Sequence, residues 1–312
     1  MTPRRTVLLR IVQVLVTIAL LVLLWRVADG ADAARVLATA DPWWLLGTLV
    51  LLSLHTLLAA ERWRVTAGAL GLSVGRWRVV REYYLSQLIN QTVPGGVVGD
   101  AGRAVRTRDH AGLTVAAQAV VVERFAGQVA MLGVMVAAFA VTTIASGGTR
   151  WPSWVLGLAA VITVGALVGV GLLLASTRLP GRSGLRLREL ARTATIALVG
   201  RRVILRQLAL SAGTTACILA AFAFSARAVG VDLPVSAVLT LVPLVLLTML
   251  IPITISGWGL REGAAAALLP VAGAAASASL AASVAFGLVA LVAVLPGAAV
   301  VWLRSHDAVS KT

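Results

Sequence analysis

The chain has 312 residues, of which 59% are hydrophobic and only 12% charged, and its mean hydropathy is +0.95. Soluble globular domains contain about 45–50% apolar and about 25% charged residues, so this composition excludes a water-soluble enzyme and indicates a polytopic membrane protein. The net charge of +15 does not indicate nucleic-acid binding, because no soluble stretch is long enough to carry a basic face.

Long apolar runs predict the membrane crossings. A transmembrane helix needs about 20 mostly apolar residues, and six runs reach that length: 7–28, 42–60, 114–143, 154–176, 208–226 and 277–303. The N-terminal arginines and the sequence Ala31-Asp32-Ala33 also fit a cleaved signal peptide. The first run, with 22 residues, is longer than the apolar core of such a peptide, so we favour a retained helix.

Basic residues in the short loops set the expected orientation, because Lys- and Arg-rich loops stay cytoplasmic. Residues 61–82 carry five Arg and two Glu, and residues 178–206 carry eight Arg and one Glu. In contrast, residues 29–41 carry three Asp and one Arg. We therefore expect both chain termini on the cytoplasmic side, which requires an even number of crossings.

Two segments, 79–112 and 237–273, do not fit as ordinary spans because polar residues, prolines and glycines interrupt them. The first contains Pro94-Gly95-Gly96-Val97-Val98-Gly99-Asp100-Ala101-Gly102-Arg103, and the second contains Pro252-Ile253-Thr254-Ile255-Ser256-Gly257-Trp258-Gly259-Leu260-Arg261. Pro, Gly and Arg recur at one offset, since 252 − 94, 257 − 99 and 261 − 103 each give 158. This recurrence indicates two related halves.

The order of the runs predicts that the two halves are inverted copies, because the interrupted segments enter from opposite sides of the membrane. The fold expected is an all-α polytopic membrane protein with six transmembrane helices, two broken or re-entrant segments and inverted-repeat pseudo-symmetry. Within the single transmembrane domain 1–312, repeat 1 is 42–145, a cytoplasmic Arg-rich linker is 178–206, and repeat 2 is 207–303. Eight transmembrane helices are the alternative, if each broken segment crosses fully.

The broken segments have the composition of an anion site. Glycines let the backbone turn sharply and bring N–H groups close to a ligand, and Arg103 lies one turn into any helix that starts near Asp100. The forked guanidinium suits a phosphate. Arg261 is placed similarly in the second segment, with Ser256 as the expected N-cap. Transporters built from inverted repeats bind their substrates at such paired broken helices.

Charged residues in apolar surroundings need a partner or a function, since a charge at the bilayer centre costs roughly 2.5–3.5 kcal/mol. Glu123 and Arg124 lie within the run 114–143, and Glu262 follows Arg261. One hypothesis is a set of salt bridges that only holds helices together; the other is a polar cavity for a charged headgroup. Asn90 and Gln91 would add neutral hydrogen bonds, in the cavity or between helices.

Other motifs predict no catalytic residue, metal or cofactor. A P-loop is excluded because the single lysine is Lys311. The G-x-S-x-G match at 71–75 lacks the strand-to-helix context of a nucleophile. The three histidines are far apart in sequence, and we expect His55 to be a packing contact. Cys217 is alone, so neither an intrachain disulfide nor a thiolate metal site can form.

Four stretches together resemble the flippase-like integral membrane proteins related to the transmembrane region of lysylphosphatidylglycerol synthases. They are Glu61-Arg62-Trp63-Arg64; Asn90 through Gly96 with Gly99, Asp100 and Arg103; Val122-Glu123-Arg124; and 252–257 with Gly259 and Arg261-Glu262-Gly263. The resemblance implies a multi-spanning protein of the bacterial inner membrane that moves a lipid headgroup between leaflets, an aminoacylated phosphatidylglycerol in the best-known members. It does not imply that lipid here, because the synthases carry a further aminoacyltransferase domain.

The function expected is therefore transport of an anionic phospholipid or a polyprenyl-phosphate-linked lipid between leaflets. We expect Arg103 and Arg261 to bind phosphate, Asp100 to cap the broken helix, and Glu123 and Glu262 to position the guanidinium groups or meet a cationic substituent. A proton on Glu123 is one option for energy coupling. The residues expected to bind substrate are Asn90, Gln91, Gly95, Gly96, Gly99, Asp100, Arg103, Glu123, Arg124, Gly257, Gly259, Arg261 and Glu262.

Two alternatives stay open at this point. The chain could be an accessory or scaffold subunit whose partners are envelope-synthesis enzymes, with purely structural charges. It could instead be a membrane glycosyltransferase that uses Asp29 and Asp32 on the outer side. Loss of activity in Asp29→Asn, with Arg103→Ala unaffected, would favour the glycosyltransferase.

Overall fold

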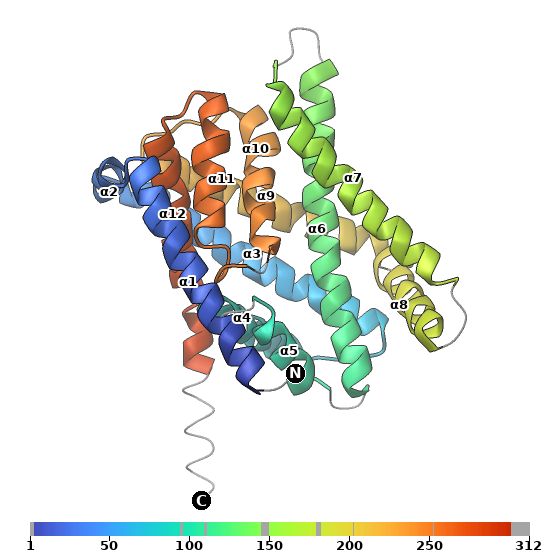
Figure 1. The fold of residues 1–312 in the computed structure, drawn as a ribbon. Coiled ribbons are helices and arrows are strands. Elements are labelled where there is room, and N and C mark those ends of the chain that lie inside the picture. Colours follow the sequence, from blue (N-terminus) through green and yellow to red (C-terminus); the bar gives the residue numbers. More distant parts are fainter. Residues whose placement is uncertain are drawn as a thin grey trace, which may run out of the picture.

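The computed structural model describes residues 3–93, 96–108, 111–144, 150–178, 182–201, 203–251 and 253–300 (Figure 1). Within these ranges the regular elements are all helices. They are α1 (Pro3–Val27), α2 (Gly30–Ala38), α3 (Pro42–Ala69), α4 (Arg76–Thr92), α5 (Val98–Arg106), α6 (Gly112–Ile144), α7 (Ser153–Ser176), α8 (Arg182–Val199), α9 (Ile204–Ala228), α10 (Val235–Leu247), η1 (Thr248–Leu250), α11 (Leu260–Leu268), η2 (Leu269–Ala272) and α12 (Ala276–Ala293).

The predicted all-α membrane fold is confirmed. Five helices among the described residues are long and apolar enough to cross a membrane: α3, α6, α7, α9, and α12 with its extension to Val300. A sixth crossing results if Ile11–Val27 and α2, bent by 89° at their junction, are counted together. The outer surface is apolar, as lipid contact requires; on α7, for example, the exposed fraction of Val161 is 70%.

The two interrupted segments each form a helix, a break and a second helix. The first consists of α4 and α5 with 17 and 9 residues, and the second of α10 and α11 with 13 and 9 residues. None of the four reaches the roughly 20 residues that a straight span needs. Pro94, Gly95 and Pro252 lie outside the described residues.

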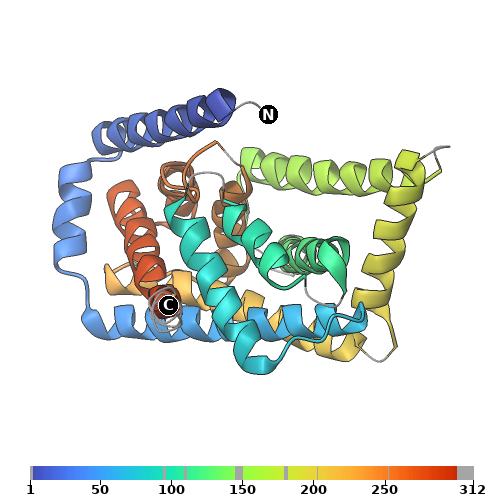
Figure 2. The same ribbon diagram turned by 90° about the horizontal axis from the view of Figure 1, so that it is seen from below.

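Helices α3 and α9 pack side by side as an antiparallel pair along the lower edge of the view in Figure 2. The Asp41 N–H donates to the Ala228 carbonyl over 2.8 Å, where α3 begins and α9 ends. At the opposite end, Gln207 of α9 donates from Nε2 to Thr66 Oγ1 of α3 over 2.9 Å. The backbones approach closely because Ala59 and Ala221, both fully buried, present small side chains in this pair of helices.

Helices α3 and α9 both end with the same backbone motif. After α3, Gly71 has φ +81° and the Leu72 N–H donates to the Ala67 carbonyl over 2.9 Å. After α9, Gly230 has φ +80° and the Val231 N–H donates to the Ala226 carbonyl over 2.9 Å. Glycine takes this left-handed conformation without a steric penalty, so both helices stop at equivalent places.

The helices of the two halves follow the same order with opposite direction. In their order along the chain, helices α1 to α6 correspond to α7 to α12. The 9-residue helices α5 and α11 occupy the same place in each half. In Figure 1, α1 and α6 run upward whereas α7 and α12 run downward. The start of α1 and the end of α12 lie at the same end of the molecule (Figure 1).

The peripheral helices extend this correspondence beyond the expected repeats. The pair α1–α2 and the pair α7–α8 lie at opposite edges of the central bundle (Figure 2). The Arg-rich segment expected as a linker contains helix α8, the counterpart of α2. Four of its eight arginines, Arg182, Arg186, Arg188 and Arg192, therefore lie on a helix that contacts α3, α6 and α9.

Candidate functional site

A cavity of about 260 Å³ lies between the two halves and is lined by residues of both. Its volume is just below the roughly 300–1,000 Å³ of pockets for drug-sized ligands, so it suits a headgroup rather than a whole lipid. One part of the wall is apolar, including Leu52, Met131, Ile218 and Phe286. The polar and charged lining residues are His55, Thr56, Arg62, Tyr83, Gln87, Asn90, Gln91, Glu123, Arg124, Gln128, Thr214, Thr215, Ser256 and Arg261.

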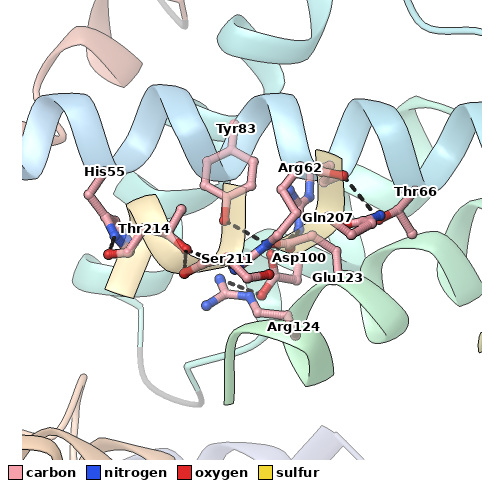
Figure 3. A network of polar contacts seen from close by, with 11 residues as sticks. His55, Arg62, Thr66, Tyr83, Asp100, Glu123, Arg124, Gln207, Ser211 and Thr214 are labelled. Atoms are coloured by element: carbon pink, nitrogen blue, oxygen red, sulfur yellow. Dashed lines mark hydrogen bonds and ion pairs between the residues drawn. The ribbon is translucent and has the colours of Figure 1, made fainter. Parts of the chain in front are cut away.

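The first charge cluster consists of Arg62, Asp100, Arg103, Glu123 and Arg124, from α3, α5 and α6. Figure 3 shows Arg62, Asp100, Glu123 and Arg124 together. Glu123 is fully buried and pairs with Arg62 at 2.9 Å and with Arg103 at 3.4 Å. Asp100 pairs with Arg103 at 3.0 Å and with Arg124 at 2.7 Å. Each carboxylate therefore holds two guanidinium groups, which offsets the cost of burying its charge.

Arg103 is the most enclosed member of this cluster, with no exposed surface. Its guanidinium carbon lies 4.5 Å from the ring centres of both Trp63 and Tyr83. Cation–π contact with two rings stabilises the charge where water is absent. Arg103 is not among the cavity-lining residues, so its position is that of a support for Asp100 and Glu123.

Arg62 and Arg124 are the two members of the cluster whose guanidinium groups line the cavity. Arg62 donates from Nη1 to Thr214 Oγ1 over 2.9 Å and has Gly127 beside it, where an added Cβ would lie 2.8 Å from Nη2. The Arg124 side chain is 40% exposed. Because both residues carry a positive charge at the wall, this side of the cavity attracts anions.

The junction of α4 and α5 is built around Asn90. Its side-chain oxygen accepts the Gly99 N–H over 2.8 Å, and its Nδ2 donates to Asp100 over 3.1 Å. A Cβ on Gly99 would lie 2.0 Å from the Ser86 carbonyl oxygen, so only glycine permits this approach. The capping role expected of Asp100 is wrong: Asn90 binds the free N–H group, and Asp100 binds guanidinium groups instead.

The second charge cluster consists of Arg261, Glu262 and Ser283, from α11 and α12. Arg261 donates from Nε to Glu262 over 3.0 Å and to Ser283 Oγ over 3.1 Å. Its guanidinium carbon lies 5.2 Å from the ring centre of Trp258 and 5.4 Å from that of Phe286. Arg261 thus has the same aromatic support in the second half that Arg103 has in the first.

Glu262 also fixes the start of α11. Its Oε2 accepts the Gly259 N–H over 2.7 Å, so Glu262 takes the place that Ser256 was expected to fill as N-cap. Ser256, with φ +51°, donates instead to the Gln91 side-chain oxygen. This hydrogen bond joins the two broken segments at the wall of the cavity, which both residues line.

The charges of the two clusters do not balance. Three guanidinium groups face two carboxylates in the first cluster, whereas Arg261 and Glu262 balance in the second, which leaves one positive charge. Nε of Arg62 and Nε of Arg124 are buried without a hydrogen-bond partner among the described residues. A single negative charge in the cavity would balance this excess positive charge.

The expected binding residues divide between the cavity wall and the layer behind it. Those that line the cavity are Asn90, Gln91, Gly96, Glu123, Arg124 and Arg261. Those that do not line the cavity are Gly99, Asp100, Arg103, Gly257, Gly259 and Glu262. Gly95 lies outside the described residues.

Sequence reasoning did not select Arg62 and His55 as site residues, although both line the cavity. The expected span ended at residue 60, whereas α3 continues to Ala69 and brings Arg62 inside. His55 is seven residues before Arg62, so both lie on one face of the helix. That spacing is the signal that could have identified them.

The acidic residues of α2 lie outside the cavity. The Asp29 side chain accepts the Asp32 N–H over 3.2 Å and so caps α2. Asp32 pairs with Arg35 at 3.2 Å on the surface. Neither residue contributes to the two charge clusters.

Comparison with known proteins gives one family match. Residues 10–297 match the family described as Lysylphosphatidylglycerol synthase TM region. No curated protein and no solved structure matches the chain.

Proposed function

The chain belongs to the family of the lysylphosphatidylglycerol synthase transmembrane region, and from this membership we propose that it moves an anionic lipid headgroup between the leaflets of a bacterial inner membrane. The observation that carries the proposal is the excess of one positive charge in the first charge cluster, from which Arg62 and Arg124 line the cavity. A buried positive charge is expensive in a bilayer unless an anion joins it.

In this proposal the phosphate of the lipid binds Arg62 and Arg124 from one half and Arg261 from the other. Asp100 and Glu123 keep the first two guanidinium groups in place through their ion pairs. Arg103 stays behind the wall and holds both carboxylates. The acyl chains stay in the bilayer, since the cavity of about 260 Å³ has room only for the headgroup.

Movement between leaflets requires the cavity to open on each side in turn, and the inverted halves suit such a motion. The hydrogen bond from Ser256 to Gln91 joins the two broken segments. We take this contact as a closed gate on one side of the site. Rocking one half against the other would separate the two residues and admit the headgroup.

The proposal is tested by reconstituting the purified chain in liposomes that contain phosphatidylglycerol with a nitrobenzoxadiazole-labelled acyl chain. Dithionite quenches the label in the outer leaflet, so the later decay reports translocation. We expect wild type to exceed protein-free vesicles and Arg124→Gln to be at least about tenfold slower, because a hydrogen bond to a charged group contributes roughly 1.5–3 kcal/mol.

Arg64→Gln is the matched control. Arg64 lies on α3 near Arg62 and pairs with Glu61 through its Nε at 2.6 Å, but it does not line the cavity. Its removal also deletes one positive charge, and translocation should stay close to the wild-type rate. Wild-type vesicles that are no faster than empty ones, or equal losses in both variants, would contradict the proposal.

A further inference from the structure

We infer that His55 is a second recognition point in the cavity and that it accepts a hydrogen bond from a hydroxyl group on the uncharged substituent that the lipid phosphate carries. The inference rests on the proposed function and narrows its substrate class. The substrate becomes a phosphodiester lipid whose headgroup carries hydroxyl groups, such as a glycerol or a sugar, and no ammonium group.

The hydrogen bond of His55 fixes which ring nitrogen accepts. Nδ1 lies 2.9 Å from the carbonyl oxygen of Thr214 (Figure 3). A carbonyl oxygen only accepts, so Nδ1 carries the proton, and Nε2 of the neutral ring is then an acceptor. Nε2 has no hydrogen-bond partner among the described residues, and His55 lines the cavity. An O–H group of a ligand would satisfy it.

Nε2 of His55 lies close to Arg62, which is proposed to bind the lipid phosphate. His55 and Arg62 are seven residues apart on α3, about 10 Å along the helix axis, and their side chains converge on Thr214. His55 binds the Thr214 carbonyl, and Arg62 binds its Oγ1. A headgroup whose phosphate binds Arg62 therefore extends a short hydroxylated arm toward Nε2.

The same cavity disfavours an ammonium group. Glu123 is the carboxylate among the described cavity-lining residues, and both of its oxygens are occupied. Oε1 accepts from Arg62 and from Tyr83 at 3.3 Å, and Oε2 pairs with Arg103. With one positive charge already in excess, an aminated or aminoacylated headgroup meets repulsion and no free carboxylate.

The test compares two labelled lipids of equal charge in the reconstituted full-length chain. Phosphatidylglycerol has two hydroxyl groups on its headgroup, whereas phosphatidylmethanol has the same phosphodiester and none. We expect wild type to translocate phosphatidylglycerol about five- to tenfold faster, which corresponds to one net hydrogen bond. Phosphatidylethanolamine should be slower than phosphatidylglycerol.

Variants of His55 test whether its imidazole causes the preference for phosphatidylglycerol over phosphatidylmethanol. His55→Ala should bring the ratio of the two rates close to one, and His55→Gln, which keeps an acceptor, should restore part of it. Leu57→Ala is the control, because Leu57 is on the same helix and 43% exposed on the outer surface. The ratio is measured within each variant, so a general loss of active protein does not change it.

The outcomes separate this inference from the proposed function. Equal rates for the two lipids in wild type, a ratio unchanged in His55→Ala, or a preference for phosphatidylethanolamine would overturn the role of His55. Dependence of those rates on Arg124 would then still support anion transport. If no labelled lipid moves faster than in empty vesicles, the proposed function fails and the inference fails with it.

Discussion

Several charged residues inside this protein are stabilised by more than one partner. Arg103 shows the pattern most fully, with two carboxylates and two aromatic rings around one guanidinium group. A planar guanidinium group can pair with carboxylates in its plane and stack on aromatic rings with its faces at the same time, which an ammonium group cannot do. The identity of the cation, and not only its charge, should therefore affect stability.

Replacing Arg103 by lysine tests this reasoning. The substitution keeps the charge but loses the stacking on Trp63 and Tyr83, and we expect it to lower the stability by about 2 kcal/mol. The measurement is the midpoint of thermal unfolding in detergent. The control is Arg35→Lys, whose side chain is 78% exposed in a surface pair and should change the stability by less than about 0.5 kcal/mol. Equal midpoints for both variants would show that the aromatic contacts contribute nothing.

At the scale of elements, the arrangement of the site depends on how closely α5 lies against α4. The Gly99 N–H bonds Asn90, and Ser86 donates to Asp100 over 2.9 Å, so the two helices hold the carboxylate between them. This contact positions Asp100 for Arg124. The break between α4 and α5 therefore has a structural role, because it lets the two helices pack together and hold the Asp100 carboxylate in position.

Gly99→Ala should separate these two helices. The new Cβ would lie 2.0 Å from a backbone oxygen, which cannot move like a flexible side chain, and overpacking of this kind costs roughly 1–3 kcal/mol. We expect lower thermal stability and strongly reduced translocation of phosphatidylglycerol. Gly165→Ala on α7 is the control, because nothing lies within 4 Å of its added Cβ. Normal transport by Gly99→Ala would mean that this contact does not position the site.

The helices themselves could be predicted from the sequence to a large extent. Among the described residues, each of the six apolar runs coincides with a helix, because a length of about 20 apolar residues depends on the chain alone. The two interrupted segments were recognised from their glycines and prolines and from the constant offset between them. The correspondence of α1–α2 with α7–α8 could not be predicted, because their sequences share no such glycines, prolines or constant offset.

The residues of the cavity wall were harder to predict. Arg62 stands between Glu61 and Arg64, and local composition suggested a loop. It is buried because Glu123, 61 residues later, pairs with it and Gly127 leaves room for it. Likewise, Arg103 matched the sequence pattern of a phosphate ligand but lies behind the wall, since two aromatic rings and two carboxylates enclose it.

At the level of the whole molecule, transport between leaflets requires the two halves to move against each other. Their broken segments meet at Gln91 and Ser256, which both line the cavity. A chain in which these positions are tied together should bind lipid but not release it to the other leaflet. This consequence distinguishes a transporter from a static scaffold that contains the same ion pairs.

The prediction is tested with Gln91→Cys and Ser256→Cys in a Cys217→Ser background, which removes the one native thiol. A bifunctional methanethiosulfonate should reduce translocation to the rate of empty vesicles, and a reductant should restore it. Each single cysteine variant, treated identically, should remain active. Full transport by the cross-linked protein would show that separation of these segments is not part of the mechanism.

The most direct measurement of the central claim is the position of lipid phosphate in an experimental structure of the protein in phosphatidylglycerol nanodiscs. We predict phosphate density in the cavity between the two halves, within hydrogen-bonding distance of Arg62 and Arg124. Headgroup density confined to the bilayer surfaces, with the cavity occupied only by water, would contradict the account.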